Sequence, residues 1–214
     1  MKIYCTRNEL NRAINNVSHS IPTRTPSPIL EGILIETKGD RMYLTATDTN
    51  MTIESNIPVD SEGDVSFVIE EKNFANIVNK LPEEEVLMDY NHEKNQIKIN
   101  SGKSSSTFNC FSADEFPRFN IGEGQKIILS KKDIKNLIRK TSFSASADEL
   151  NGVLTGILIE LGDGNLRMVA VDTFRMAIYN AKVDTDEKLS IVVPAKLLGE
   201  VSKIISDDDN DEQL

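Results

Sequence analysis

Residues 154–176 read LTGILIELGDGNLRMVAVDTFRM. Two runs of aliphatic and β-branched residues, 156–161 and 166–171, lie on either side of a Gly-Asp-Gly-Asn sequence at 162–165. An Asp-Gly pair between two such runs is a strong signal for a β-hairpin. The stretch therefore predicts two antiparallel strands, and the second ends in a charged corner at 172–175 with the sequence DTFR.

The same pattern occurs earlier in the chain. Residues 30–50 read LEGILIETKGDRMYLTATDTN, and a shift of 124 residues places them on 154–174 without a gap. Nine of the 21 aligned positions are identical: Leu30/Leu154, Gly32/Gly156, Ile33/Ile157, Leu34/Leu158, Ile35/Ile159, Glu36/Glu160, Ala46/Ala170, Asp48/Asp172 and Thr49/Thr173. Self-similarity at a fixed offset indicates a chain built from repeated structural units. We therefore expect two domains, a complete one at residues 1–124 and a truncated one at 125–214 that lacks its last strands.

The hydrophobic periodicity predicts a repeating order of elements, which is a strand, a helix and three further strands. The predicted strands span residues 2–6, 32–37, 42–47, 51–57, 65–69, 86–90, 96–100, 107–111, 126–129, 156–161, 166–171, 175–181 and 189–193. The predicted helices span residues 7–17, 71–81, 131–141 and 194–205, and Thr6 and Ser130 are placed to cap two of them. Helices and sheets must cover their apolar sides. We therefore expect an α+β fold with helices side by side on one face of antiparallel sheets.

The composition indicates a protein of a reducing compartment. The first residues, MKIYCTRNEL, lack the apolar core of a signal peptide, and no apolar run approaches the length of a transmembrane helix. The two cysteines, Cys5 and Cys110, do not suggest a disulfide framework. We therefore expect a cytoplasmic protein with no membrane partner. The formal net charge of −10 argues at first against a nucleic-acid partner, but the distribution of the charge decides that question.

The helix predicted at residues 131–141 has a basic outer face. Lys131, Lys135 and Arg139 are spaced i, i+4, i+8, and the only acid, Asp133, lies near the N-terminus, where the helix dipole favours it. The other predicted helices contribute further outward cations: Arg12, Lys72, Lys196 and Lys203. Such faces are either simply solvated or face phosphates with little sequence preference. Both interpretations stay open on the pattern alone.

Sequence motifs for catalysis are missing. The chain has no GxxxxGKS or GxxxxGKT phosphate loop and no GxGxxG, and His19 and His92 have no spacing typical of zinc ligands. The best carboxylate candidates are Asp48 and Asp172, which occupy equivalent positions in different repeats. Each either closes a turn by accepting backbone N–H bonds, which we favour, or takes part in catalysis. We expect no cofactor and no bound metal.

Several of these features together resemble the bacterial sliding clamps, the beta subunits of the replicative DNA polymerase holoenzyme. The resemblance rests on LTGILIE, on the corner MVAVDTFRMA, on the basic helix that begins LSKKDIKNLI and on the period of the duplication. It covers the whole chain, including TRTPSPIL at 23–30 and FSADEFP at 111–117. In that family three such domains form a subunit. Two subunits join head to tail into a ring whose helices line a hole for duplex DNA.

The resemblance implies a non-catalytic processivity factor of DNA replication. Such a protein binds double-stranded DNA without sequence preference and forms a homodimeric ring when full length. It also binds the polymerase catalytic subunit and the clamp loader through short peptide motifs. The whole chain would then be the first clamp domain and most of the second.

The resemblance also assigns roles to individual residues. The loop arginine that faces DNA matches Arg24. The partner-peptide pocket includes positions that match Leu154, Val171, Thr173, Phe174, Arg175 and Met176. The subunit-interface strand matches residues 103–108, which include Lys103, Ser106 and Phe108. Three residues depart from the family pattern: Asn151 and Gly152 replace a frequent arginine and proline, and Phe174 replaces a histidine.

Two other functions remain as alternatives. A repeat-built scaffold for protein interactions would share the duplication without binding DNA. A carboxylate- or metal-dependent hydrolase would use Asp48 or Asp172, and loss of activity in a folded Asp172→Asn variant would favour it.

Overall fold

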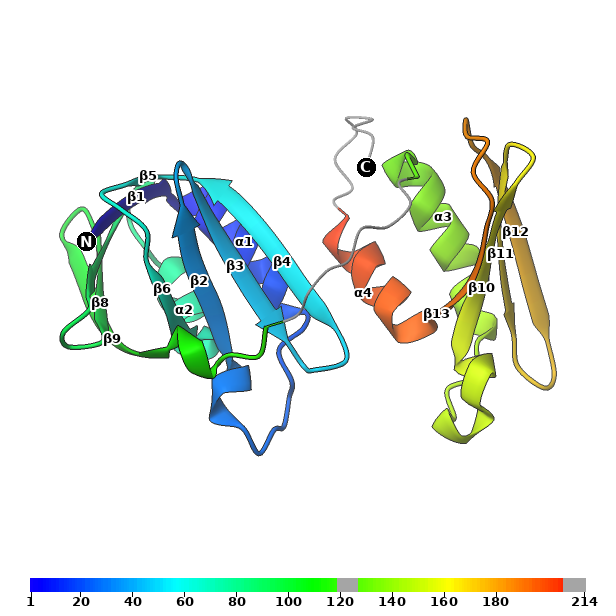
Figure 1. Cartoon of the computed structure of the whole chain (residues 1–214), viewed down its shortest axis with the longest axis horizontal. Helices are drawn as coiled ribbons and strands as arrows, with labels where there is room; N and C mark the ends of the chain where they lie inside the picture. The colour runs from blue at the N-terminus through cyan, green and yellow to red at the C-terminus, as the bar shows by residue number, and fades with distance from the viewer. Residues whose placement is uncertain (119–126, 206–214) are drawn as a thin grey trace. The chain divides into compact units, whose positions relative to one another are not determined.

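The computed structural model describes residues 1–118 and 127–205. Contacts divide the chain into two compact units, Met1–Ile121 and Gly122–Leu214, and each unit is described by itself. Both units combine helices with β-sheet (Figure 1), and every strand pairing among the described residues is antiparallel. The α+β class expected from the sequence is confirmed.

The first unit is built on a nine-stranded sheet with the order β4-β3-β2-β6-β9-β8-β7-β1-β5. Its strands are β1 (Lys2–Thr6), β2 (Gly32–Lys38), β3 (Arg41–Thr47), β4 (Thr52–Pro58), β5 (Asp60–Ser61), β6 (Ser66–Glu70), β7 (Glu85–Asn91), β8 (Gln96–Ser101) and β9 (Ser104–Ser112). Its helical elements are α1 (Arg7–Ser18), α2 (Glu71–Val78) and the 3-10 turns η1 (Pro28–Glu31) and η2 (Ala113–Glu115). Helices α1 and α2 contact each other, as expected for neighbours on one face of the sheet.

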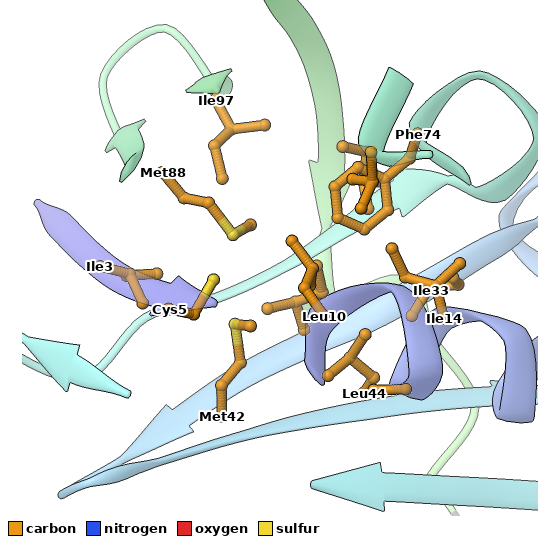
Figure 2. Packing of buried hydrophobic residues seen from close by; sticks show 14 of the residues in the cluster. Ile3, Cys5, Leu10, Ile14, Ile33, Met42, Leu44, Phe74, Met88 and Ile97 are labelled. Atoms are coloured by element: carbon orange, nitrogen blue, oxygen red, sulfur yellow. The ribbon is translucent and has the colours of Figure 1, made fainter. Parts of the chain in front are cut away.

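Helix α1 begins at Arg7 because Thr6 caps it. The Glu9 N–H donates to Thr6 Oγ1 at 3.4 Å, and the Thr6 hydroxyl donates to Glu9 Oε2 at 2.8 Å. One side of the helix is buried at a spacing of three and four residues: Leu10, Ala13, Ile14 and Val17. Figure 2 shows Leu10 and Ile14 in a single cluster with Phe74 of α2 and with apolar residues of the sheet. This cluster is the core of the first unit.

The second unit has a four-stranded sheet with the order β12-β11-β10-β13. Its elements are α3 (Lys131–Thr141), η3 (Ser142–Ser144), η4 (Glu149–Thr155), β10 (Gly156–Gly162), β11 (Asn165–Val171), β12 (Met176–Lys182), β13 (Leu189–Pro194) and α4 (Ala195–Ile204). Helix α3 contacts β11 and β12, α4 contacts β10 and β13, and the two helices contact each other. A separate core, which includes Leu137, Ile157 and Leu198, lies between these helices and the sheet.

The hairpin predicted at residues 162–165 is present and has the turn type that its sequence favours. Gly162 pairs with Asn165, and the two residues between them, Asp163 and Gly164, have φ of 53° and 69°. Positive φ at both central positions defines the type I′ turn, which matches the twist of the flanking strands. The hairpin is therefore specified locally, by an Asp-Gly pair that tolerates this backbone conformation.

One helix ends earlier than predicted. Helix α2 stops at Val78, whereas the sequence predicted a helix to Leu81. Beyond Val78 the chain tightens, since Lys80 N–H donates to Ile77 O at 3.0 Å and Leu81 N–H donates to Val78 O at 3.2 Å. Leu81 precedes Pro82, and a residue before proline disfavours the helical conformation. The apolar Leu81 nevertheless stays buried, which explains why periodicity alone extended the helix.

The prediction of a strand at residues 126–129 is wrong for the residues of it that the structure describes. Lys126 lies outside the described residues, and residues 127–129 do not form a strand. Their counterpart in the first repeat is β1, which pairs along its length with β7. Within the described part of the second unit no strand pairs with residues 127–129 as β7 pairs with β1. The other predicted elements have boundaries within three residues of the observed ones. Among the described residues, the elements that the sequence did not predict are the two-residue strand β5 and the four 3-10 turns.

Candidate functional site

Helix α3 presents the most basic surface of the second unit. Ser130 caps the helix by accepting the Asp133 N–H at 3.0 Å, and Leu137 and Ile138 are buried on its inner side. Arg139 is exposed, as are the adjacent Lys132 and Lys140. Lys131 and Lys135, which the spacing put on the same outward stripe as Arg139, are half-buried. The outward face of α3 is therefore basic, but its exposed cations are Lys132 near the start of the helix and Arg139 and Lys140 near its end.

The other predicted DNA-facing cations are all exposed. They are Arg12 on α1, Arg24 in the segment between α1 and η1, Lys72 on α2, and Lys196 and Lys203 on α4. Lys203 is the least available of them, because its Nζ lies 2.9 Å from Glu200 Oε1. Since the helices of each unit contact in pairs, α1 with α2 and α3 with α4, each pair carries exposed cations. Such a distribution of exposed cations over each helix pair is sufficient for long-range electrostatic attraction of phosphates.

The carboxylates of Asp48 and Asp172 close equivalent turns. Asp48 Oδ1 accepts the N–H groups of Asn50 and Met51 at 2.9 and 2.7 Å. Asp172 Oδ1 accepts those of Phe174 and Arg175, both at 2.9 Å. The turn role that we favoured for both residues is confirmed.

The charge of Asp172 is stabilised by these bonds. The hydrogen bond from the Phe174 N–H lowers the pKa of Asp172 below its ordinary value, and the backbone and side chain of Arg175 lower it further. A carboxylate committed in this way is a poor general base. Among the described residues, no group of three or more His, Cys, Asp and Glu side chains could hold a metal ion.

The residues of the predicted peptide pocket lie around the Asp172 turn. Val171 and Met176 are paired at the end of the β11–β12 ladder, and Leu154 lies at the end of η4, directly before β10. Phe174 is 94% exposed and Met176 is 62% exposed, whereas Leu154 and Val171 are half-buried. Thr173 and Arg175 are also exposed. A half-buried floor with two large apolar side chains in solvent is typical of a surface that binds another molecule.

Sequence reasoning missed three exposed apolar residues of the same unit. Leu150 and Val153 on η4 are 93% and 67% exposed, and Phe143 on η3 is 57% exposed. Phe143 contacts the corner directly, because the Arg175 guanidinium carbon lies 5.6 Å from the centre of its ring. No periodicity marks these residues, since they lie in short 3-10 turns. In the sequence, only the presence of apolar residues in segments between the regular helices and strands could have indicated that these side chains are exposed.

The predicted subunit-interface residues lie along one edge of the first unit. Strand β9 pairs with β8 along residues 104–109, but it pairs with β6 only at Cys110, Phe111 and Ser112. Residues 104–109 therefore have an open edge among the residues that the structure describes. Ser106 lies on this segment, and Lys103 is exposed in the preceding turn. Phe108 is half-buried and packs edge-on against Phe74, with 6.3 Å between the ring centres.

Two family models match the chain in succession. They are described as the N-terminal domain of the DNA polymerase III beta subunit, which matches residues 1–120, and the central domain of the same subunit, which matches residues 128–214. Within residues 1–118 and 127–205, the structure contains no helix with the length and apolar character that crossing a membrane requires.

Known proteins with similar sequences are beta sliding clamps. The protein from Halalkalibacterium halodurans is 37% identical over 94% of this chain and 56% of its own length, and that from Bacillus subtilis is 35% identical over 99% and 58%. Among solved structures, the DNA polymerase sliding clamp of Bacillus subtilis has a TM-score of 0.92 and 33% identity, and covers 100% of this chain and 58% of its own. A putative DNA polymerase III beta subunit from Eubacterium rectale has a TM-score of 0.92, 32% identity and the same coverage. The chain thus spans a little over half the length of the relatives it matches.

Proposed function

Because this chain belongs to the family of bacterial DNA polymerase III beta subunits, the sliding clamps, we propose that it acts in DNA replication as part of a non-catalytic processivity factor. The complete protein encircles duplex DNA and tethers the polymerase to it. The observation that carries the proposal is the succession of two clamp domains in the order that the family models have, on a chain whose helices carry exposed cations despite a net charge of −10. Residues 1–120 then correspond to the N-terminal domain of the family and residues 128–214 to its central domain.

The DNA-facing surface consists of the outward sides of the four helices and the loop that contains Arg24. The contributing residues are Arg12, Arg24, Lys72, Lys131, Lys135, Arg139, Lys196 and Lys203. Their exposure or half-exposure on a negatively charged protein supports this assignment. Contacts of lysine and arginine with phosphate carry no sequence information. A ring that must move along DNA needs such weak, sequence-independent contacts and no others.

The corner around Asp172 is the site for partner peptides of the polymerase and the clamp loader. Leu154, Val171 and Met176 supply an apolar wall, and Arg175 supplies a charged anchor. Phe174 extends the apolar surface where the family has a histidine. The large exposure of Phe174 and Met176 supports this role, because monomeric proteins leave few such side chains in solvent.

The open edge of β9 is where a second subunit pairs to close the ring. An unpaired strand edge readily adds a strand from another chain, and the edge at residues 104–109 is available in the described structure. Lys103, Ser106 and Phe108 then lie at the subunit interface. The assembled protein is a homodimer and works in the cytoplasm.

Topological retention tests the proposal. The protein as its gene encodes it is loaded by its clamp loader onto a nicked circular DNA, and retention is measured before and after the circle is cut. We expect the protein to stay on the circle and to slide off the linear product, because an encircling ring is held by topology and not by affinity. Equal loss from both DNAs would contradict encirclement. Absence of any DNA association at low salt would instead favour the scaffold without DNA binding.

A further inference from the structure

The guanidinium of Arg175 is held from two directions. Its Nε lies 3.0 Å from Asp172 Oδ2 and donates a hydrogen bond to it. Its guanidinium carbon Cζ lies over the ring of Phe143, 5.6 Å from the ring centre. An ion pair through Nε and an aromatic ring beside Cζ together restrict the position of the group.

The terminal nitrogens of Arg175 remain available. The Arg175 side chain is 58% exposed, and in the described structure neither Nη1 nor Nη2 has a hydrogen-bond partner. An arginine has five N–H donors, so the Asp172 bond leaves four of them. These four face outward as a planar fork, the geometry that suits a carboxylate or a carbonyl oxygen of a peptide.

The supports of Arg175 are themselves fixed. Asp172 Oδ1 accepts two backbone N–H groups, so its other oxygen has a defined position. Phe143 is exposed, but Thr141 and Ser144 close to it are fully buried. The 3-10 turn η3 is therefore anchored from beneath and presents the ring outward. The contact of the Phe143 ring with the Arg175 guanidinium is the cation–π contact of this site.

The first repeat shows that the turn does not need this pair. Asp48 closes the equivalent turn with the same backbone bonds, and Asp48 N–H donates to Met51 O at 3.1 Å as Asp172 N–H donates to Arg175 O at 3.1 Å. At the 124-residue offset, Met51 stands in place of Arg175 and His19 in place of Phe143. The carboxylate is thus common to both turns, whereas the arginine and the phenylalanine at these positions occur only in the second.

We propose that Phe143 is a positioning residue of the peptide site, which holds the Arg175 fork ready for a carboxylate or carbonyl group of an extended peptide ligand. The proposal rests on the proposed peptide-binding function. The ligand also places an apolar side chain against Phe174 and Met176, which are exposed beside the fork. Pre-ordering the fork reduces the conformational entropy that binding would otherwise cost.

A double-mutant cycle tests the coupling. The protein as its gene encodes it is titrated with a labelled synthetic peptide that carries the clamp-binding motif of the replicative polymerase. We expect Phe143→Leu to weaken binding about two- to fivefold, the range for an exposed cation–π contact, and Phe143→Tyr to leave it within about twofold. In an Arg175→Met background, Phe143→Leu should have no further effect, because the group that it positions is gone. An equal loss in both backgrounds, or no loss in either, would overturn the proposal.

A second measurement separates this inference from the peptide site itself. The Arg175 Nε–H proton is followed by NMR in the 214-residue chain without peptide. We expect a slowly exchanging signal that Phe143→Leu broadens or shifts while the melting temperature stays unchanged. An unaltered signal would overturn the positioning role whatever the peptide does. Absence of peptide binding by the unsubstituted protein would overturn the proposed peptide site, and the role of Phe143 in it.

Discussion

Val192 lies so close to Gly156 that a Cβ atom at residue 156 would overlap with Val192 Cγ1, and Val68 stands in the same relation to Gly32. Both glycines begin a strand that pairs with the strand of the valine, β2 with β6 and β10 with β13. The identity of Gly32 and Gly156 in the duplicated sequence therefore has a steric cause. Each valine covers the space that a larger residue would need.

Gly156→Ala should destabilise the second unit. The added methyl group meets Val192 and the backbone of Val193, so the strands must shift, at a cost of about 1–3 kcal/mol in the free energy of unfolding. Urea denaturation measures this change. Gly162→Ala at the other end of β10 is the matched control, because nothing lies within 4 Å of its Cβ position. The free energy of unfolding of the control should stay within about 0.5 kcal/mol of that of the unsubstituted protein. Equal losses of unfolding free energy in both variants would refute the steric explanation.

Neutralising the basic face of α3 should weaken DNA retention without changing sequence preference. The variant is Lys131→Gln, Lys135→Gln, Arg139→Gln in the protein as its gene encodes it. Each lost phosphate contact should flatten the plot of log affinity against log salt by roughly one unit. The control neutralises three exposed cations of the strands, Arg41, Lys98 and Arg167, and so makes the same change in net charge. Identical salt slopes for the two triple variants would show that α3 does not face DNA.

Met176→Lys should abolish peptide binding but leave the fold intact. Met176 is 62% exposed, so a lysine there meets solvent in the free protein, whereas in a complex its charge would be desolvated against an apolar ligand. We expect a loss of more than about tenfold in affinity and a nearly unchanged melting temperature. Ile178→Lys is the control, since Ile178 is 53% exposed on the same strand and two residues further along. A peptide affinity equal to that of the unsubstituted protein would exclude Met176 from the site.

The Asp172 turn should contribute pH-dependent stability. The pKa of the Asp172 carboxyl in the folded protein is below the ordinary 3.8, chiefly because of the hydrogen bond from the Phe174 N–H. Folding therefore favours the charged form of this carboxyl. The contribution of Asp172 to the free energy of unfolding is then fully present above about pH 5. It is lost as the pH falls below the ordinary pKa of the carboxyl and then through its lower pKa in the folded protein. The melting-temperature difference between the unsubstituted protein and Asp172→Asn should shrink accordingly. A carbon NMR titration of the Asp172 carboxyl with a midpoint at or above 3.8 would contradict this account.

The sequence predicted the elements that depend on local chemistry. The type I′ hairpin follows from Asp163 and Gly164, and the starts of α1 and α3 follow from the caps Thr6 and Ser130. The prediction from sequence failed for elements whose conformation depends on residues far away in the chain. Residues 127–129 needed a strand neighbour, a requirement that their own alternation cannot reveal. The end of α2 was misplaced because buried Leu81 continues the apolar period beyond the last helical residue.

The candidate site shows the same division. The corner residues Phe174, Arg175 and Met176 were found because they follow a predicted strand and match a family pattern. Phe143 was not found, because only the contact of η3 with β11 and β12 brings it to Arg175. The half-burial of Lys131 and Lys135 also depends on tertiary packing, since helical spacing fixes which residues share a side but not how deeply a neighbouring element covers it.

The aspartate turn bears on how two copies of one ancestral unit could diverge. The Asp48 and Asp172 carboxylates each accept two backbone N–H groups through Oδ1, and these bonds do not depend on which side chains follow the aspartate. The two positions that end each turn can therefore differ between the repeats while the backbone bonds of the turn stay the same. The first repeat carries Asn50-Met51 at these positions and the second carries Phe174-Arg175. A backbone turn common to both repeats and a surface chemistry that differs between them thus reside in adjacent residues.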